Sequence, residues 1–435
     1  MPKHTPYSAL LHRLPHRLVR VLRDIGQLGD EQGYQIYVVG GVVRDLLLRQ
    51  ATLDLDLAVE GDGIALARVV STRYRTGLVV FERFSTARLV FRDGLKMDIA
   101  TTRQESYAQP AVLPTVQPAS IQEDLHRRDF TINAIAIQLN PGQFGRVFDP
   151  YGGQRDLRTR TVRVLHACSF QDDPTRVFRA IRFEQRLGFR LERTTLRLLA
   201  QAAATSLIRH LSGPRLQNEI LLLCGEHDPV SGIARLVQLK LLRFLHRRLC
   251  YPANVKRVVT VVPKALVWWA RRLKDSGVDR PLVFFMALVS GCSPVVIAAT
   301  IRRLALSGEQ ARKVSAVSRL DRVRERLTKE RTIGGSKVFH LLENFSNEAL
   351  VLLVATELGS PHKVQPSRLK RHVAAYVKHR SIKTILGGRD LQALGLKPGP
   401  QFKTILGELL DARLDGIIST EAEERAFIQK KLGTR

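Results

Sequence analysis

Tyr37-Val38-Val39-Gly40-Gly41-Val42-Val43-Arg44-Asp45 opens the stretch that decides the fold of this chain, and Leu53-Asp54-Leu55-Asp56-Leu57 follows it closely. Side chains of a β-strand alternate between its two faces, so Asp54 and Asp56 share one face while the leucines fill the other. Hard oxygen ligands of this kind suit Mg²⁺, and two such ions can activate an attacking hydroxyl and stabilise a leaving pyrophosphate. An isolated Asp-x-Asp is more often a solvated strand face, so the neighbouring segments decide its interpretation.

Gly40 and Gly41 end an apolar run that begins at Ile36, and they precede an expected helix over residues 42–48. Backbone N–H groups can approach a triphosphate at such a turn, because glycine has no side chain in the way. Arg44 adds a cationic group to the same turn. The alternative is a plain glycine turn with a solvated arginine, and the carboxylate strand that follows favours phosphate binding.

A stripe of charged residues occurs later in the chain, where Asp173, Arg176, Arg179 and Arg182 follow one another at intervals of three. In a helix such residues lie side by side, so Asp173 and Arg176 present an acceptor beside a planar donor. Cytosine and adenine each offer an amino group next to a ring-nitrogen acceptor, whereas uracil and guanine offer the reverse order. The pair therefore fits CTP and ATP, and Arg179 and Arg182 face phosphates or an orienting carboxylate. The alternative is a salt-bridged surface helix.

These segments, together with residues 127–133 (Arg-Arg-Asp-Phe-Thr-Ile-Asn), resemble the class II tRNA nucleotidyltransferase and bacterial poly(A) polymerase superfamily. The family pattern is Gly-Gly-x-x-Arg-Asp, then Asp-x-Asp, then Arg-Arg-Asp-x-x-x-Asn. Residues 98–107, 149–157 and 172–183 resemble further segments of the family. One departure is Asp172, which stands where the family usually has Glu, and its shorter side chain can shift how Arg176 is held.

The resemblance implies an α+β fold, with a small mixed nucleotidyltransferase head of the polymerase-β-like type followed by an all-α neck, body and tail. The expected segments are an N-terminal helical extension (1–33), the catalytic head (34–165), a neck with the nucleotide-recognition helix (166–235), and a helical body and tail that bind tRNA (236–435).

The activity that the resemblance implies is template-independent addition of CMP and AMP to the tRNA 3′ end, from CTP and ATP, with Mg²⁺ as cofactor and release of pyrophosphate. Two alternatives use the same head: a poly(A) polymerase, and a specialist that adds only CC or only A. An alternative of another class is a catalytically silent RNA-binding protein.

Site residues follow from the same motifs. Asp54 and Asp56 are the expected catalytic and metal-binding residues. The expected nucleotide-binding residues are Gly41, Arg44, Arg128, Asp173, Arg176, Arg179 and Arg182. The expected supporting residues are Asp98, Arg103, Asp129 and Asn133. Among these, Asp98 has two expected roles, support of the metal site or a tether to Arg103, of which the tether is favoured. Asp129 is expected to cap a helix that begins near Phe130.

Composition agrees with an RNA partner, because 69 Lys and Arg against 40 Asp and Glu give a formal charge of +29 and a pI near 10.8. The four cysteines lack metal-type spacing, which favours reduced, buried thiols. The chain start lacks the apolar core of a signal peptide, and no run approaches the ~20 apolar residues of a membrane span. We therefore expect a cytoplasmic protein without a membrane partner.

The period of the apolar residues changes along the chain. It predicts an amphipathic helix over 15–32, mixed strands and helices over 34–165, and almost wholly helical structure after about residue 172. Residues 110–118 contain three prolines and no charge, so regular structure is expected to break there.

Overall fold

The structure is a computed structural model that describes residues 8–50, 55–106, 114–273, 277–329, 333–360 and 368–433. Predicted site residue Asp54 lies outside these ranges. The chain divides into two compact units, Met1–Arg215 and Leu216–Arg435.

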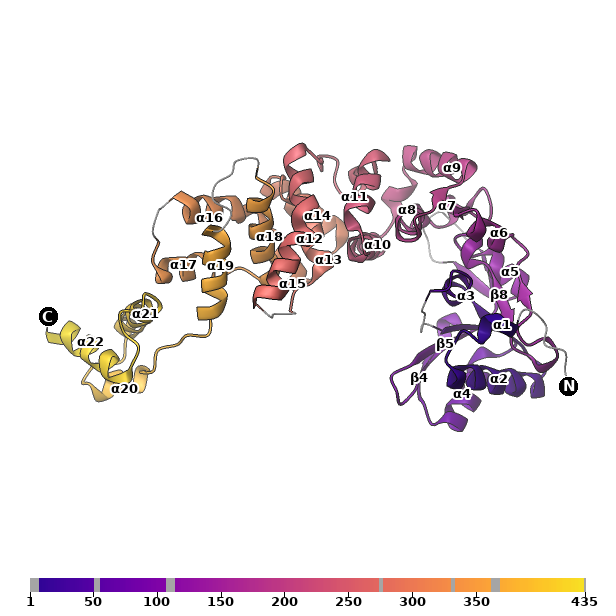
Figure 1. Cartoon of the computed structure of the whole chain (residues 1–435), viewed down its shortest axis with the longest axis horizontal. Coiled ribbons are helices and arrows are strands. Elements are labelled where there is room, and N and C mark those ends of the chain that lie inside the picture. Colours follow the sequence, from indigo (N-terminus) through magenta and orange to yellow (C-terminus); the bar gives the residue numbers. More distant parts are fainter. Residues whose placement is uncertain are drawn as a thin grey trace. The chain divides into compact units, whose positions relative to one another are not determined.

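A seven-stranded sheet forms the centre of the first unit, with strand order β3-β4-β5-β2-β1-β8-β9. Figure 1 labels its strands β4, β5 and β8. Strands β2 and β5 are parallel, and the other neighbours in this sheet are antiparallel. The strands are β1 (Gln35–Val39), β2 (Leu55–Glu60), β3 (Gly77–Phe81), β4 (Thr86–Val90), β5 (Lys96–Thr101), β8 (Ala136–Gln138) and β9 (Val147–Phe148). Two further pairs join β6 (Arg103–Ser106) to β7 (Thr115–Pro118) and β10 (Thr161–Val162) to β11 (Arg190–Leu191).

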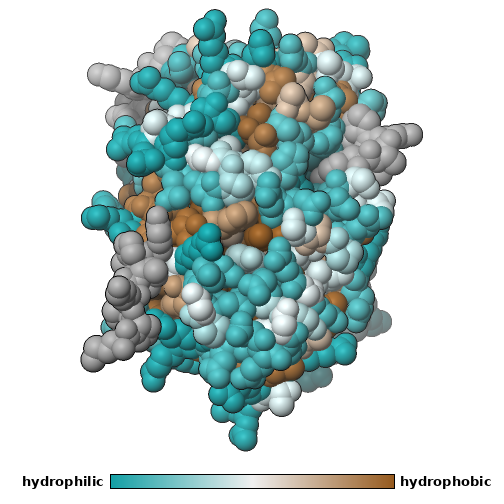
Figure 2. Space-filling model, turned by 90° about the vertical axis from the view of Figure 1, so that its right-hand side faces the viewer, coloured by the Kyte–Doolittle hydropathy of each residue, from teal (hydrophilic) through white to brown (hydrophobic). Residues whose placement is uncertain are grey.

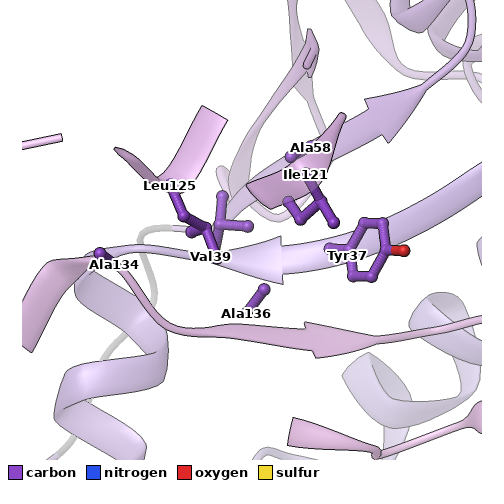
Figure 3. Packing of buried hydrophobic residues seen from close by; sticks show 7 residues of the cluster. All are labelled: Tyr37, Val39, Ala58, Ile121, Leu125, Ala134 and Ala136. Carbon is purple, nitrogen blue, oxygen red and sulfur yellow. The ribbon is translucent and has the colours of Figure 1, made fainter. Parts of the chain in front are cut away.

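Helices pack on both faces of this sheet. The helices of the first unit are α1 (Ser8–Leu11), α2 (His16–Glu31), α3 (Gly41–Leu47), α4 (Gly63–Tyr74), α5 (Ile121–His126), α6 (Gly153–Arg158), α7 (Ser169–Asp172), α8 (Arg176–Leu187) and α9 (Arg193–Ala204), of which α2, α3, α4 and α5 contact strands of the sheet. On one face α2 packs on β1, and α4 packs on β3, β4 and β5. On the other face Ile121 and Leu125 of α5 pack with Val39 and Ala58 in a buried cluster completed by Tyr37, Ala134 and Ala136 (Figure 3). This packing fixes the end of α5, where the Arg-Arg-Asp segment follows.

The predicted elements around the glycine turn are confirmed. The helix expected over 15–32 is α2, and the one expected over 42–48 is α3. Leu55 and Leu57 of β2 are buried, as the alternation requires, and Asp56 between them is half-buried. Of the expected break over 110–118, residues 110–113 lie outside the described ranges. The prediction is wrong for the last four residues, because Thr115–Pro118 forms β7. A proline is tolerated there because this pair has two edge strands.

The second unit is helical. Its helices are α10 (Gly213–Gly225), which begins at the unit boundary, α11 (Pro229–Gln238), α12 (Ala253–Leu273), α13 (Arg280–Val289), α14 (Pro294–Leu304), α15 (Gly308–Ser315), α16 (Val317–Lys329), α17 (Gly335–Leu342), α18 (Asn347–Leu358), α19 (Arg368–His379), α20 (Gly388–Ala393), α21 (Pro400–Leu414) and α22 (Glu421–Gly433). Helices α12, α13 and α18 pack against one another, and α20, α21 and α22 share a separate apolar cluster.

Within the described residues, no single helix has both the length and the apolar composition needed to cross a membrane. Helices α17 and α18 meet both criteria only when taken together, and they are bent by 112° where they join. Hydrophilic residues cover most of the face shown in Figure 2, with hydrophobic residues in small groups between them. The expectation of four buried thiols is wrong for Cys168 and Cys250, which are exposed, whereas Cys224 is buried.

Candidate active site

The turn after β1 brings three predicted elements of the site together. Gly40 has φ +77° and ψ −133°, a conformation that residues with a side chain rarely adopt. A Cβ at Gly40 would lie 2.8 Å from Nη1 of Arg128 and 3.8 Å from Oδ2 of Asp56. The glycine turn, β2 and Arg128 therefore meet at one place, where a guanidinium group and a carboxylate approach the same stretch of backbone.

Asp56 and Asp98 are neighbours in register across the parallel strands β2 and β5, and Asp98 is in register with Arg88 on β4. Residues in register point to the same face of a sheet. Arg88 donates from Nε and Nη2 to the two carboxylate oxygens of Asp98, at 2.7 Å each. The predicted tether between Asp98 and Arg103 is therefore wrong, because Arg88 holds Asp98 instead.

Arg103 has other partners. Its Nη1 donates to the carbonyl of Phe84 at 2.8 Å and its Nη2 to Glu105 at 3.3 Å, while Glu105 also accepts from Arg127 at 2.9 Å. Burial, followed by the charge of Arg127, lowers the pKa of Arg103. Arg103 therefore connects β6 to the Arg-Arg-Asp segment rather than to β5.

Asp124 of α5 is a residue of the site that the sequence reasoning missed. Its Oδ1 accepts from Nη2 of Arg127 at 2.7 Å, and its Oδ2 accepts from Nη2 of Arg128 at 3.0 Å. Burial acts to raise the pKa of Asp124, but the charges of Arg128 and Arg127 outweigh it and lower the pKa. The spacing of three and four residues from Asp124 to the two arginines is the signal that points to this role. Asp124 thereby fixes Arg128 beside Gly40.

Four predicted site residues form one chain of hydrogen bonds. Arg44, which is 4% exposed, donates from Nη1 to Asn133 at 2.7 Å, and Asn133 donates to Oδ1 of Asp129 at 2.9 Å. Oδ2 of Asp129 accepts from Nη2 and Nε of Arg179 at 2.6 and 2.9 Å. Burial acts to raise the pKa of Asp129, but Arg179 and Asn133 lower it overall. Arg179 therefore faces an orienting carboxylate, which confirms one of its two predicted positions, and Arg44 is directed into the protein.

Asp129 does not cap a helix, so that prediction is wrong. Its Oδ1 accepts from the backbone N–H of Phe130 at 2.8 Å, but the next element is a single 3₁₀ turn, Thr131–Asn133, which has no side-chain cap. Asp129 instead organises the site through Asn133 and Arg179.

The predicted stripe of four residues is wrong at its first member. Helix α8 begins at Arg176, whereas Asp173 ends α7 in an extended conformation with φ −133° and ψ 96°. Pro174 explains the difference, because a residue that precedes proline is driven out of the helical region. Arg176, Arg179 and Arg182 do lie on α8.

Arg176 is fixed by partners on both sides of it. It is 5% exposed, its Nη1 donates to Oγ of Ser169 at 2.7 Å, and its Nη2 donates to the carbonyl of Arg127. A guanidinium group has five N–H donors, so this arrangement leaves donors for a further partner.

A cavity of about 730 Å³ lies beside Arg176. Its lining includes His126, Tyr151, His166 and Asp172. The rings of His126 and His166 stack with 4.9 Å between their centroids, and Oδ2 of Asp172 lies 3.8 Å from Nε2 of His166. Asp172 thus lies beside His166, while Ser169 and the carbonyl of Arg127 hold Arg176.

Carboxylate oxygens for a cation are present on β2 and β5. Within the ranges that the structure covers, no group of three or more His, Cys, Asp or Glu side chains is arranged to hold a metal ion. The described part of the predicted pair is Asp56, and Asp98 lies beside it in register. Hard oxygen donors of this type are the ones that Mg²⁺ prefers.

Comparison with known families matches two parts of the chain. Residues 36–163 match the Poly A polymerase head domain. Residues 188–251 match a domain described as the probable RNA and SrmB-binding site of polymerase A.

Curated relatives have names that agree with these matches. An A-adding tRNA nucleotidyltransferase of Geobacter sulfurreducens is 40% identical over 417 residues, which is 94% of this chain and 47% of that protein. The chain thus spans about half the length of that relative. An A-adding tRNA nucleotidyltransferase of Halalkalibacterium halodurans is 31% identical over 96% of this chain and 94% of its own length.

Solved structures extend the similarity to the whole fold. An apo CCA-adding enzyme matches with a TM-score of 0.82 and 32% identity over 98% of both chains. The Thermotoga maritima CCA-adding enzyme complexed with tRNA matches with a TM-score of 0.76 and 31% identity over 97% of both chains. The α+β head followed by helices, predicted from the sequence, is the fold of these proteins.

Proposed function

Because the chain belongs to the tRNA nucleotidyltransferase family, we propose that it adds nucleotides to the 3′ end of tRNA without a nucleic-acid template. The observation that carries the proposal is the meeting of Gly40, Asp56 and Arg128. A backbone without side chain, a carboxylate and a guanidinium group at these distances suit a nucleoside triphosphate and its metal ion.

In the proposed site Asp54 and Asp56 hold Mg²⁺, with Asp98 as a supporting carboxylate one strand away. When bound, the ion activates the terminal hydroxyl of the tRNA and stabilises the departing pyrophosphate. Arg128 binds phosphate oxygens with its planar fork, and the backbone at Gly41 approaches the same phosphates.

The proposed reaction is an in-line displacement at the α-phosphorus. The 3′-hydroxyl oxygen of the tRNA forms a new bond to the α-phosphorus, and its proton is released to solvent. The bond between the α-phosphorus and the oxygen that bridges it to the β-phosphate breaks, and pyrophosphate leaves with that electron pair. Arg44 acts indirectly, because it holds Asn133 and through it Asp129 and Arg179. These residues keep α3, the Arg-Arg-Asp segment and α8 in a fixed arrangement.

Asp173 and Arg176 select the base in this proposal. The carboxylate accepts from the amino group of adenine or cytosine, and a guanidinium N–H donates to the adjacent ring nitrogen. Ser169 and the carbonyl of Arg127 hold the guanidinium group of Arg176 in place, which supports a role for Arg176 as a rigid contact to the base. Arg182 lies six residues beyond Arg176 on α8, and in this proposal it assists nucleotide binding.

The proposed division of labour follows the segments expected from the sequence. The head (34–165) carries catalysis, the neck (166–235) carries base selection, and the helical body and tail (236–435) bind tRNA. The formal charge of +29 supports RNA binding, because phosphate contacts favour excess Lys and Arg. Similarity to a structure solved with tRNA supports it as well.

Addition of a single AMP from ATP to tRNA that ends in CC is our first candidate for the specific activity. Two relatives that match at least 94% of this chain, at 40% and 31% identity, are both named A-adding enzymes. Full CCA addition from CTP and ATP is the second candidate, and the similarity to solved CCA-adding enzymes favours it.

The deciding experiment uses labelled CTP and ATP, separately and together with Mg²⁺, on four tRNA transcripts that end before the CCA, after its first C, after CC, or after CCA. Extension of the CC end by one A alone supports the A-adding activity, and ordered growth from every incomplete end supports full CCA addition. A long ladder of A residues indicates a poly(A) polymerase. Salt-sensitive tRNA binding without any incorporation contradicts the proposed function and favours a silent RNA-binding protein.

Asp54→Asn and Asp56→Asn test the proposed catalytic residues. Each change is expected to abolish transfer while tRNA binding persists, because the amide is a poor ligand for a hard cation. Asp93→Asn is a matched control, since Asp93 is an exposed carboxylate that pairs with Arg17. If a variant with both Asp54→Asn and Asp56→Asn transferred nucleotides near the parent rate, the chemistry would not use these two residues.

A further inference from the structure

The carboxylate of Asp173 is held through one of its two oxygens. Oδ1 accepts from the backbone N–H of Thr175 at 2.9 Å, from Oγ1 of Thr175 at 2.6 Å and from Nη2 of Arg215 at 2.7 Å. Within the described ranges, Oδ2 accepts no hydrogen bond. The Asp173 side chain is 22% exposed, so a ligand can reach it.

Three donors on one oxygen fix the direction of the other. The final torsion of an aspartate side chain is broad, so an unrestrained carboxylate exchanges its oxygens readily. The contact with Arg215 is charge-assisted and therefore stronger than a neutral hydrogen bond. Thr175 is buried and lies two residues from Asp173, so its two donors are fixed by the turn at Pro174.

Arg215 lies 42 residues beyond Asp173, in the first turn of α10, and it is the last residue of the first unit. It is the donor that comes from outside the turn, and its partner oxygen is on the residue that we assign to base selection. Arg176, the second reader, is itself fixed by Ser169 and the carbonyl of Arg127. Both halves of the base reader are thus anchored to other parts of the first unit.

We propose that Arg215 is a positioning residue that sets nucleotide selectivity by fixing the carboxylate of Asp173. This inference rests on the proposed function. With Oδ1 occupied, Oδ2 is the acceptor for the amino group of adenine or cytosine. Guanine and uracil carry a carbonyl at the corresponding position, and its lone pairs repel a carboxylate that cannot turn away. When the carboxylate can rotate, it no longer rejects the wrong base as strongly.

The test compares kcat/KM for ATP and GTP on a tRNA that ends in CC, and for CTP and UTP on shorter tRNAs if the parent uses CTP. Arg215→Gln is expected to lower the preference for the correct base by about tenfold or more, the effect of one charged hydrogen bond. Arg215→Lys is expected to restore part of the preference, since it keeps the charge. Thr175→Val is expected to lower the preference less, since it removes the hydroxyl alone.

Arg73→Gln is the matched control. Arg73 donates to Asp24 at 2.8 Å between α4 and α2, so the change breaks a comparable ion pair in the same unit. Selectivity is expected to equal that of the parent.

A double-mutant cycle separates positioning from general stability. If Arg215 acts through Asp173, Arg215→Gln changes selectivity by less than about twofold in the Asp173→Ala background. Two results would overturn the inference. One is that the losses of selectivity caused by Arg215→Gln and Asp173→Ala add up in the variant with both changes. The other is that an active Arg215→Gln enzyme keeps the selectivity of the parent. If circular dichroism shows that Arg215→Gln does not fold, the selectivity of Thr175→Val becomes the deciding measurement. Selectivity equal to that of the parent in Thr175→Val would then overturn the inference. An inactive parent contradicts the proposed function instead.

Discussion

Gly40→Ala tests whether the glycine turn and Arg128 form one site. The backbone at φ +77° and ψ −133° is strained for alanine, which costs about 1–3 kcal/mol of stability. The new Cβ would also lie 2.8 Å from Nη1 of Arg128, so that group must retreat by roughly 0.6 Å to reach ordinary contact. Because Asp124 holds the other end of the guanidinium group, the retreat is opposed.

The kinetic effect follows from the displaced guanidinium group. Loss of one charged hydrogen bond to the triphosphate, worth about 1.5–3 kcal/mol, lowers kcat/KM for the nucleotide about 10- to 150-fold. Nucleotide titrations at saturating tRNA measure this change, and urea denaturation measures the loss of stability.

Gly33→Ala is the matched control for this prediction. Gly33 also has a positive φ, +71°, but a Cβ there would meet nothing within 4 Å. It is expected to lose about 1–2 kcal/mol of stability and to keep parent kinetics. If Gly40→Ala loses stability like Gly33→Ala but keeps the parent kcat/KM, then Arg128 does not contact the nucleotide from the position described.

Three further predictions concern stability. Leu125→Ala removes a fully buried side chain from the cluster over β1 and should cost about 2–5 kcal/mol in urea denaturation; a cost below 1 kcal/mol would contradict the packing. The pKa of Asp124 is lowered from 3.8, so its ionisation stabilises the fold above pH 3.8 and this contribution is lost as the pH falls through the lower folded value. Asp124→Asn should therefore be about 3–5 kcal/mol less stable at neutral pH, with the difference narrowing in acid; a constant difference would refute this. Hydrogen bonding to Asp411 is the largest cause that raises the pKa of His340 above 6.5, so the contact between α17 and α21 stabilises the tail below pH 6.5 and weakens as the pH rises through the raised value. His340→Gln should reduce the pH-dependent part of the free energy of unfolding of α17 and α21, by less than about 1 kcal/mol. Hydrogen exchange measures this free energy, and a pH profile equal to that of the parent would exclude a stabilising role for His340.

The elements around the glycine turn could be predicted from the sequence because their signals are local. The apolar run before Gly40 predicts a strand, and the alternation of Leu55, Asp56 and Leu57 predicts which face is buried. The order of the segments, a head followed by helices, came from the resemblance to the nucleotidyltransferase family. The strand before Gly40 and the helix after it do not contain this information.

Other parts of the site depend on contacts that local patterns do not contain. The i, i+3 spacing placed Asp173 on a helix, although Pro174 already signals an extended residue before it. Arg215 meets Asp173 across 42 residues, and Arg88 meets Asp98 across a turn between two strands. Only the fold brings these groups together, so spacing could not identify them.

The row of Arg88, Asp98 and Asp56 has an electrostatic consequence for the head. Two carboxylates side by side repel each other, and Arg88 supplies a counter-charge that belongs to the protein itself. Neutralisation of Asp98 therefore does not depend on an ion from solution. A cation that recruits Asp98 has to compete with Arg88. It can bind this carboxylate only in exchange for the side chain that already neutralises it.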